Sequence, residues 1–538
     1  MTEEVKKQAG ADGAICGRYT AQVSNRFAYL SRAWDCAELT IPSLLPRAGH
    51  SSHSTLPTPW QSVGAEGVNN LSSRLLMASF PANHPFFRQK LDELAVARLM
   101  AEAGNAADGK NQKTLLDAGL SAQERAVMTE VETSGDRVSL FESFKHLLVV
   151  GNVLLHDSKL GLRVYHLDHY VVRRDPSGNP LEILAFEQVD PVILPQYFQD
   201  LAAVKARETG DGNAEAPVDM YTQVIRRDTH WDVSQEVCGQ VVQESKGTYR
   251  LDECPWIPLR FAKIDGENYG RGYVEEYLGD FRNCEHLSQA LTEGAEAAAL
   301  TILLCNPNGS TSKSALTKAR NGDVISGKAD EVTMLQSGKA MDFSTAEKRL
   351  AVIENRLQRA FLLNTATQRN GDRVTAEEIR YMAQELESIL GGFYTILSKE
   401  LQLPYIKSKM AQMRKRGALK PLPQGLVKTS IITGMDAMGR DKDGQTLKDF
   451  MTDVAQTFGP DNAALYINVS EGITRLATSR GIDTQNLVNK REDVEAQQQQ
   501  QQQQAMIHKL GPQAISAGGK LAGEAMKANG QGTGTTGS

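Results

Sequence analysis

The feature that most constrains the fold is a pair of amphipathic helices separated by a short polar loop. Apolar residues recur at three- and four-residue spacing from Leu350 to Phe361, behind a capping box that begins at Ser344. A second capping box at Thr375 opens another helix with its own apolar stripe. The loop between the helices, residues 364–374, is polar and contains a glycine. Two long helices joined in this way predict a mainly helical fold.

The remaining sequence alternates between helical and strand-like stretches. Residues 17–155 are expected to be mainly helical, with breaks at Pro42 and Pro46 and with separate helices near 87–105 and 121–155. Strands are expected over 162–261, followed by one long helix over 273–304 and a polar segment with several glycines over 306–343. The two helices described above come next, the second ending at Pro404, and helix is expected again after Pro423. At 538 residues, this pattern predicts an α+β, mainly helical protein with several subdomains.

The last forty residues differ from the rest in composition. Eight glutamines occupy residues 497–504, and a Gly/Thr-rich run closes the chain. Such a segment cannot bury enough apolar surface to offset its ordering entropy, so we expect disorder after about Gly518. Glutamine is also a fair helix former, which leaves a helical extension as the alternative.

Charge and composition exclude several classes of protein. The formal net charge of −6 argues against a protein that coats DNA, because such proteins neutralise phosphates with an excess of Lys and Arg. The six cysteines form no C-x-x-C pair and are expected to be free thiols. The polar N-terminus has no signal peptide, and the longest apolar runs fall short of the roughly 20 residues of a membrane span.

One phosphate-binding motif nearly appears between Gly322 and Lys328. The run has the G-x-x-x-x-G-K spacing, but Ala329 stands where a Ser or Thr hydroxyl should hold magnesium. The preceding segment is polar rather than a buried strand, so a glycine-rich surface loop is favoured. The sequence also contains neither H-E-x-x-H nor G-x-S-x-G.

His166 and His169 flank Asp168, and these three residue types could bind a metal ion. On a strand, residues 166 and 168 share a face while residue 169 points away, so the three side chains are not expected to converge. The sequence therefore predicts no catalytic, cofactor-binding or metal-ligating residues.

The polar loop between the two long helices contains the best candidates for a ligand contact. Gln368, Arg369, Asn370 and Arg373 surround Gly371. Arginine and amide side chains can donate hydrogen bonds to phosphate oxygens without reading bases. Composition alone also fits a solvated turn between helices, and that alternative stays open at this point.

Several long stretches, in the same order, resemble the portal, or head-to-tail connector, proteins of short-tailed bacteriophages of the autographivirus type. The resemblance covers roughly residues 10–490, and the glutamine run departs from the family pattern. The stretches are DCAELTIPSLLP (35–46), TPWQSVGAEGVNNLSSRLLMASFP (58–81), VVGNVLL (149–155), YGRGYVEEYLGD (269–280), QRNGDRVTAEEIR (368–380) and LGGFYTILSKELQLP (390–404).

The resemblance implies a portal-type subunit built from wing, stem, clip, channel loop and crown, which assembles into a ring. The implied divisions are a flexible N-terminus (1–16), a helical wing part (17–160), a β-rich wing part (161–268), a stem helix (269–304), the clip (305–343), a second stem helix (344–363), the channel loop (364–374), a long helix (375–404), a helical crown region (405–496) and a largely disordered tail (497–538).

The resemblance also implies a function without enzymatic activity and without a cofactor. About twelve copies would form a ring at the capsid vertex of the virion, after assembly in the host cytoplasm. The implied partners are double-stranded viral DNA, the terminase during packaging, tail adaptor and internal core proteins, and the major capsid and scaffold proteins, but no membrane. Gln368, Arg369, Asn370 and Arg373 would face DNA, whereas Lys313, Lys318 and Arg320 in the clip would face the terminase and later the tail.

The charge balance fits a conduit, since twelve chains of −6 give a ring of −72 that repels DNA except at a few arginines. Two alternatives belong to other classes. One is an internal virion scaffold protein without a channel, and the other is a nucleotide hydrolase that uses the run from Gly322 to Lys328.

Overall fold

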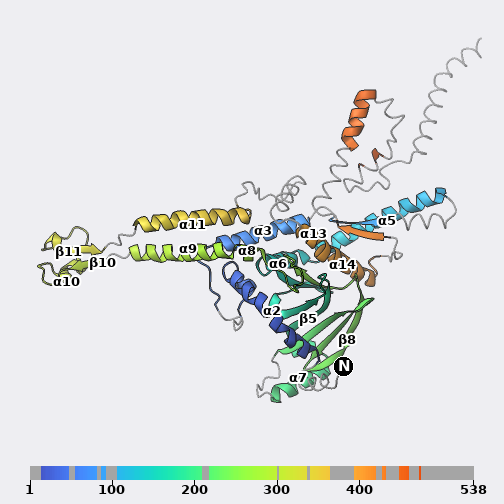
Figure 1. The fold of residues 1–538 in the computed structure, drawn as a ribbon, viewed down its shortest axis with the longest axis horizontal. Coiled ribbons are helices and arrows are strands. Elements are labelled where there is room, and N and C mark those ends of the chain that lie inside the picture. Colours follow the sequence, from blue (N-terminus) through green and yellow to red (C-terminus); the bar gives the residue numbers. More distant parts are fainter. Residues whose placement is uncertain are drawn as a thin grey trace, which may run out of the picture. The chain divides into compact units, whose positions relative to one another are not determined.

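The computed structural model of the chain divides into two units, residues 1–435 and 436–538. About 54% of the described residues are helical and 22% lie in strands, which confirms the prediction of a mainly helical α+β fold (Figure 1). The structure describes residues 14–47, 55–81, 86–92, 106–208, 217–299, 302–335, 340–363, 393–419, 427–431, 447–459, 472–473 and 476.

Helices form the part of the first unit that precedes the larger sheets. They are α2 (Ala14–Glu38), α3 (Val63–Ser79), α5 (Ala106–Thr133) and α6 (Asp136–Val149). On α3, Val68, Leu71 and Leu75 are fully buried at three- and four-residue spacing, and this face packs against α6. The N-terminus of α2 is held by Glu236, whose carboxylate accepts hydrogen bonds from the backbone N–H groups of Ile15 (2.7 Å) and Cys16 (3.2 Å).

Two antiparallel sheets occupy the region in which the sequence predicts strands. One has the order β3-β2-β9, and the other is a five-stranded meander, β4-β5-β6-β7-β8. Helix α7 (Gln196–Glu208) interrupts the meander between β5 and β6. The strands are β2 (Asn152–Ser158), β3 (Gly161–Tyr165), β4 (Tyr170–Arg174), β5 (Pro180–Val189), β6 (Val218–Arg226), β7 (His230–Val237), β8 (Gln240–Arg250) and β9 (Trp256–Arg260).

A further strand pair corrects the prediction of helix at both of its positions. β1 (Phe87–Leu91) lies where a helix near residues 87–105 was expected, and β12 (Val427–Ile431) lies in the region expected to be helical after Pro423. The two strands pair antiparallel, Phe87 opposite Ile431. Each strand is only five residues long, and its partner is remote in sequence. The local residue pattern therefore does not reveal the pairing, and it predicts helix instead. Residues 93–105 lie outside the described residues.

The predicted helix over residues 121–155 ends earlier than expected. Helix α6 stops at Val149 and β2 begins at Asn152. Gly151 between them has φ +78°, and a Cβ there would come within 2.3 Å of the Arg271 carbonyl carbon. Glycine permits both the left-handed backbone and the close approach, so the chain turns from helix into strand at this residue.

The expected single helix over residues 273–304 is divided. Helix α8 (Tyr273–Glu276) is followed by α9 (Leu278–Ala299), and then by a short strand, β10 (Ile302–Cys305). The predicted capping box at Ser344 is also wrong, because α11 (Ala340–Ala360) has begun four residues earlier. A capping side chain acts only where N–H groups lack a helical partner, and Ser344 lies inside the helix. The second predicted capping box, at Thr375, lies outside the described residues.

Pro404 does not end its helix as predicted. α13 (Phe393–Leu397) continues through a π-helical turn, η6 (Ser398–Gln402), into α14 (Leu403–Lys415), with Pro404 in the first turn of α14. Proline has no N–H to donate to the preceding turn of a helix. In the wider π-helical turn before Pro404, the Leu403 N–H donates to the Ser398 carbonyl, five residues back.

A buried charged cluster joins α14 to α6 and β2. The Lys409 ammonium lies 2.8 Å from Asp136 Oδ2 and 2.9 Å from Asp157 Oδ1, and all three side chains are at most 4% exposed. The Tyr405 hydroxyl donates to Asp136 and the Ser408 hydroxyl donates to Asp157, both at 2.6 Å. Burial raises the pKa of the Asp157 carboxyl despite Lys409. Burial alone would lower the pKa of Lys409, but Asp157 and Asp136 raise it overall, so the lysine stays charged.

Candidate functional site

Helices α9 and α11 lie side by side and antiparallel (Figure 1). Near one end of the pair, the Arg356 guanidinium lies 3.2 Å from the Asp280 carboxylate. Near the other end, Phe343 packs against Gly294, where a Cβ would come within 2.4 Å of the ring. Glycine at this position therefore lets the two helices approach closely.

Phe361 anchors the pair to the core of the first unit. Its side chain is fully buried, and its ring centroid lies 5.3 Å from Tyr273, 5.9 Å from Tyr277 and 5.6 Å from Phe281. Helix α3 approaches the same ring at Gly67, where a Cβ would lie 2.8 Å from Phe361 Cγ. The apolar stripe that predicted this helix is confirmed, since Phe361 shares it with the buried Ile353 and Leu357.

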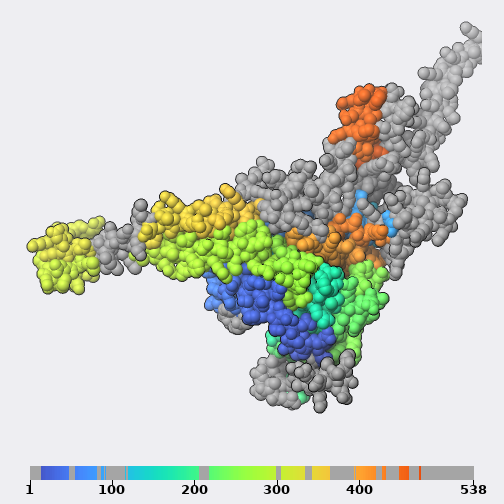
Figure 2. Space-filling model, viewed as in Figure 1, coloured from blue at the N-terminus to red at the C-terminus, as the bar shows by residue number. Residues whose placement is uncertain are grey.

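Away from this anchor, the two helices form an exposed band (Figure 2). Glu293 and Glu296 are exposed on α9, and Lys348 and Arg349 are exposed on α11. None of the four side chains forms an ion pair within the described part of the chain. The band therefore offers acidic and basic groups to a neighbouring molecule.

A small folded segment connects α9 to α11. Strands β10 and β11 (Val332–Leu335) pair antiparallel, and α10 (Lys313–Lys318) lies between them in the chain. Glu331 fastens the loop that follows β10, because its carboxylate accepts from the Thr311 hydroxyl (2.7 Å), the Thr311 N–H (2.9 Å) and the Ser310 hydroxyl (3.0 Å). These hydrogen bonds, those from Thr311 first, lower the pKa of Glu331 to about 2.

The structure brings the predicted clip residues into this segment. Lys313 begins α10 and Lys318 ends it, and Arg320 follows two residues later. All three side chains are exposed. The Arg320 N–H donates to Asp323 Oδ2 at 2.7 Å, which turns the chain just beyond α10. These residues are available to a partner, and their assignment to a particular one stays a prediction.

The run from Gly322 to Lys328 lacks the geometry of a phosphate-binding loop. It follows α10 rather than a buried strand and leads into a single 3-10 turn, η5 (Ala329–Glu331), rather than a long helix. Val324 is fully exposed, and the Lys328 N–H donates to Thr311 Oγ1 at 3.2 Å instead of pointing into a cradle. This arrangement fits a surface loop and gives no support to a nucleotide hydrolase.

The predicted DNA-facing residues Gln368, Arg369, Asn370 and Arg373 lie outside the described residues. The chain is described up to Leu363 and again from Phe393. Their role remains a prediction from sequence.

The strand assumed at His166 is wrong, and its two histidines do converge. A 3-10 turn, η3 (Leu167–His169), brings the His166 and His169 ring centroids to 3.9 Å, and His146 stacks on His166 at 6.4 Å. Burial, and to a lesser extent the neighbouring His166 and Lys145, lowers the pKa of His146 to about 3. The pKa of His166 is lowered to about 4, mainly by burial. Neutral, mostly buried rings of this kind are packing elements, and the described residues contain no group of three or more potential metal ligands.

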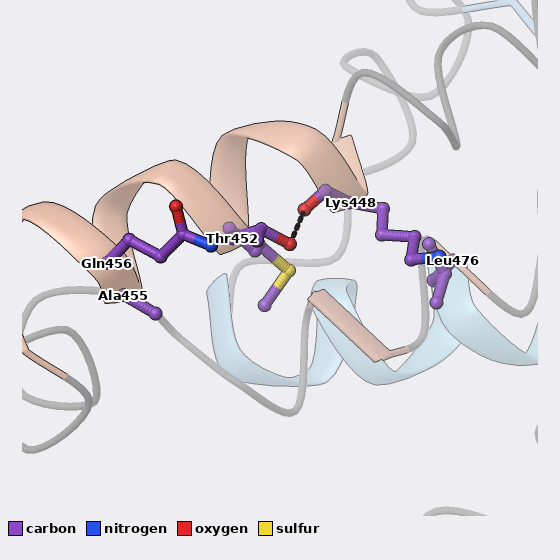
Figure 3. A pocket seen from close by; sticks show the side chains of 6 residues that line it. Lys448, Thr452, Ala455, Gln456 and Leu476 are labelled. Carbon is purple, nitrogen blue, oxygen red and sulfur yellow. Dashed lines mark hydrogen bonds between the residues drawn. The ribbon is translucent and has the colours of Figure 1, made fainter.

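A shallow cavity of about 470 Å³ lies in the second unit (Figure 3). The helix over residues 447–458 and Leu476 form its wall. The Thr452 hydroxyl donates to the Lys448 carbonyl at 2.8 Å, so this hydroxyl is engaged with its own helix. Among the described residues that line the cavity, Lys448 is the one charged side chain, and these residues include no acid–base pair. No helix among the described residues is long and apolar enough to span a membrane.

Comparison with known proteins identifies relatives over almost the whole chain. A family model described as bacteriophage head to tail connecting protein matches residues 13–488. The portal protein of Escherichia phage T7 is 38% identical over 495 residues, which cover 90% of this chain and 90% of that protein. The portal protein of Enterobacteria phage T3 is 38% identical over 503 residues, which cover 92% of each chain.

Similarity to solved structures is weaker. A chain in the neck of an empty GTA particle, computed with C6 symmetry, aligns with 77% of this chain and 89% of its own length. The sequence identity is 12% and the TM-score is 0.33.

Proposed function

This chain belongs to the bacteriophage head to tail connecting protein family, and we propose that copies of it form the ring through which DNA enters and leaves the phage head. The family predicted from sequence is confirmed. The observation that carries the proposal is the 38% identity to a portal protein over 90% of both chains, because a match of that extent supports the same role for this chain.

The helical pair and its connecting segment support an assignment of the stem and the clip of such a ring. In the proposal, α9 and α11 are the stem, and the segment from β10 to β11 is the clip. Residues 17–160 and 161–268 form the helical and β-rich parts of the wing. Residues 364–374 form the channel loop, and residues 405–496 form the crown. The exposed Lys313, Lys318 and Arg320 then form the surface that meets the terminase and later the tail proteins.

Ring formation is the experiment that tests this function. A closed ring repeats one interface whose two sides differ. The exposed Glu293 and Glu296 of α9 and the exposed Lys348 and Arg349 of α11 are proposed to contribute to these two sides. Native mass spectrometry of the purified chain is expected to show a narrow cluster near about twelve or thirteen subunits. A stable monomer or dimer at micromolar concentration, under several salt conditions, would overturn the proposal.

Contact between the ring and DNA is proposed for Arg369, with Arg373 in a lesser role. An arginine repeated around the ring gives a girdle of positive charge in an otherwise acidic bore, and each guanidinium can donate two hydrogen bonds to a phosphate. Each exposed contact is worth on the order of 1 kcal/mol or less, which lets DNA slide. Retention then depends on many subunits acting together.

Arg369→Ala is expected to leave ring assembly intact and to reduce the DNA content per particle. Arg373→Ala is expected to have a smaller effect, because it lies two residues before the predicted helix start at Thr375. The measurement is phage yield and DNA per head with the variant supplied in place of wild type. Arg250→Ala, at an arginine of the β8 end whose side chain is 54% exposed, is the control. Full heads at normal yield with Arg369→Ala would return the loop to a solvated turn.

A further inference from the structure

Helix α7 and the turn before it cover one end of the five-stranded sheet. The turn, η4 (Pro191–Ile193), leads from β5 into α7. Gln199 of α7 fastens the turn, because its Nε2 donates to the Leu194 carbonyl at 2.8 Å and to the Val192 carbonyl at 3.3 Å. The buried side chains beneath them form a cluster of their own, Val189, Leu194, Phe198, Val237 and Val242. The turn and the helix therefore form one fixed surface, residues 190–204, which we call the sheet-end surface.

Large apolar side chains are exposed along the sheet-end surface. Val192 is 74% exposed and Ile193 is 71% exposed, and both belong to η4. Tyr197 and Val204 are exposed on α7, seven residues apart and therefore on one face of the helix. Isolated exposed apolar residues are normal on a protein, whereas four of them between residues 192 and 204 form a concentration that is typical of an interaction site.

Every charged side chain described at this end of the sheet is acidic. The described ranges that meet there are residues 187–204, 217–221 and 235–242, which hold the adjoining ends of β5, β6, β7 and β8. Their charged residues, with no Lys, Arg or His among them, are Glu187, Asp190, Asp200, Asp219 and Glu236. Residues 205–216 add two cations and three anions to the sequence, so the charge balance of the whole stretch stays acidic.

Three of these five carboxylates are available to a partner. Glu187 pairs with Arg163, and Glu236 holds the start of α2. The exposed Asp190, Asp200 and Asp219 accept hydrogen bonds from neutral groups instead, namely the Val192 N–H and the amides of Gln196 and Gln188. Asp200 follows Tyr197 by three residues and precedes Val204 by four, so it shares their face of α7. Acidic groups therefore lie among the exposed apolar side chains.

This combination of apolar and acidic groups selects the chemistry of a partner. Carboxylates repel the phosphates of nucleic acids and of anionic lipids, and they repel a second copy of the same acidic surface. A cationic segment is attracted instead, and apolar side chains on that segment can cover Val192 and Ile193. A helix with a basic face beside an apolar face offers both kinds of group at once.

We propose that the sheet-end surface is a docking site for a cationic amphipathic helix of another protein. The apolar face of that helix covers Val192 and Ile193 of η4, and its Lys or Arg side chains meet Asp190 and Asp200. The site does not depend on ring formation, because every group that carries it belongs to one subunit.

A synthetic helix of leucine and lysine tests the docking. A fluorescently labelled peptide of about 18 residues, with leucines on one face and lysines on the other, is titrated with the full chain, and its anisotropy is measured. Val192→Ser is expected to weaken binding by about fivefold to tenfold, because it removes apolar contact area. Val138→Ser is the matched control, since Val138 lies on α6 and is also 74% exposed. Equal affinities of the two variants would overturn the proposal.

Ile193→Ser is a second variant in the same turn. Its side chain is exposed, so its replacement removes no core contact, and binding is expected to weaken by a similar factor. Unchanged peptide binding by Ile193→Ser would contradict the docking site, even if Val192→Ser could not be purified.

Charge is tested separately from apolar contact. Asp200→Asn is expected to weaken binding of the peptide by about threefold and to reduce its dependence on salt. Asp265→Asn is the control, because Asp265 is an exposed acid outside the sheet-end surface. A second peptide with glutamates in place of the lysines is expected not to bind. Equal binding of the two peptides, or equal effects of the two variants, would show that acidic groups do not select the partner.

Hydrogen exchange measured by mass spectrometry locates the bound peptide. Slower exchange of backbone N–H groups is expected over residues 190–204, and protection confined to other segments would contradict the site. Vesicles of phosphatidylcholine and phosphatidylserine are tested in parallel. If the chain binds these vesicles, and Val192→Ser abolishes that binding, the surface belongs to a membrane contact and the proposal fails.

Discussion

Lys409→Met is expected to lower the free energy of unfolding by about 3–5 kcal/mol, because it leaves two buried carboxyl groups without their shared cation. Asp136 and Asp157 are 1% and 0% exposed, so water cannot replace the ammonium. Methionine fills a similar volume, which confines the change mainly to charge. The shift of the urea midpoint, at an unchanged slope, measures the effect.

Lys407→Met on the same helix is the control. The Lys407 ammonium lies 3.6 Å from the half-exposed Asp252, and its loss is expected to cost less than about 1 kcal/mol. Adding Asp157→Asn to Lys409→Met removes one of the two carboxylates that have lost Lys409, and it should recover part of the lost free energy of unfolding. A Lys409→Met protein as stable as the control would show that the cluster contributes little.

Acidification from pH 6.5 to about 4.5 is expected to destabilise the subunit before its surface carboxylates titrate. Burial, with a smaller effect of neighbouring charges, lowers the pKa of His146 to about 3 and that of His156 and His166 to about 4. In the unfolded chain histidine binds a proton near pH 6.5. The unfolded state therefore binds more protons in this window, and each histidine removes about 1.4 kcal/mol of stability per pH unit.

The pH dependence has a counter-effect and a clean control. Because the pKa of Asp157 is raised in the folded state, the folded protein takes up a proton there before the unfolded chain does. This uptake opposes the loss of stability on acidification by at most the effect of one titrating group. His146→Leu is expected to reduce the slope of unfolding free energy against pH by one proton. The same change at the exposed His286 should leave the slope unaltered. A flat stability curve from pH 6.5 to 4.5 would contradict the prediction.

Local patterns predicted the helical pair well. The stripe from Leu350 to Phe361 places Ile353, Leu357 and Phe361 on one face, and the structure buries all three. Runs of β-branched and aromatic residues on either side of a Gly/Pro-rich turn likewise indicated strands after residue 161. The loop residues around Arg369, which sequence singled out for DNA, lie outside the described residues and stay a prediction.

Contacts between remote residues could not be read from such patterns. Lys409 reaches Asp157 across 252 positions, and Asn70 reaches Phe361 across 291, with no local periodicity to mark either pair. The turn at His166 was missed for a different reason, since three residues of 3-10 helix leave no periodic signal between two strands. Long-range polar contacts decided the positions of both the buried cluster and the end of α11.

The pairing of β1 with β12 has a consequence for the synthesis of the protein. Phe87 meets Ile431, so about 340 residues must leave the ribosome between the two partners. At translation rates of about 5–20 residues per second, this delay is roughly 17–70 s. Throughout that interval the backbone groups of β1 that later bond to β12 lack their partner, although its Phe87 is fully buried in the finished subunit. Helix pairs that are close in sequence can form on the nascent chain, but the subunit cannot close this strand pair until it is nearly complete.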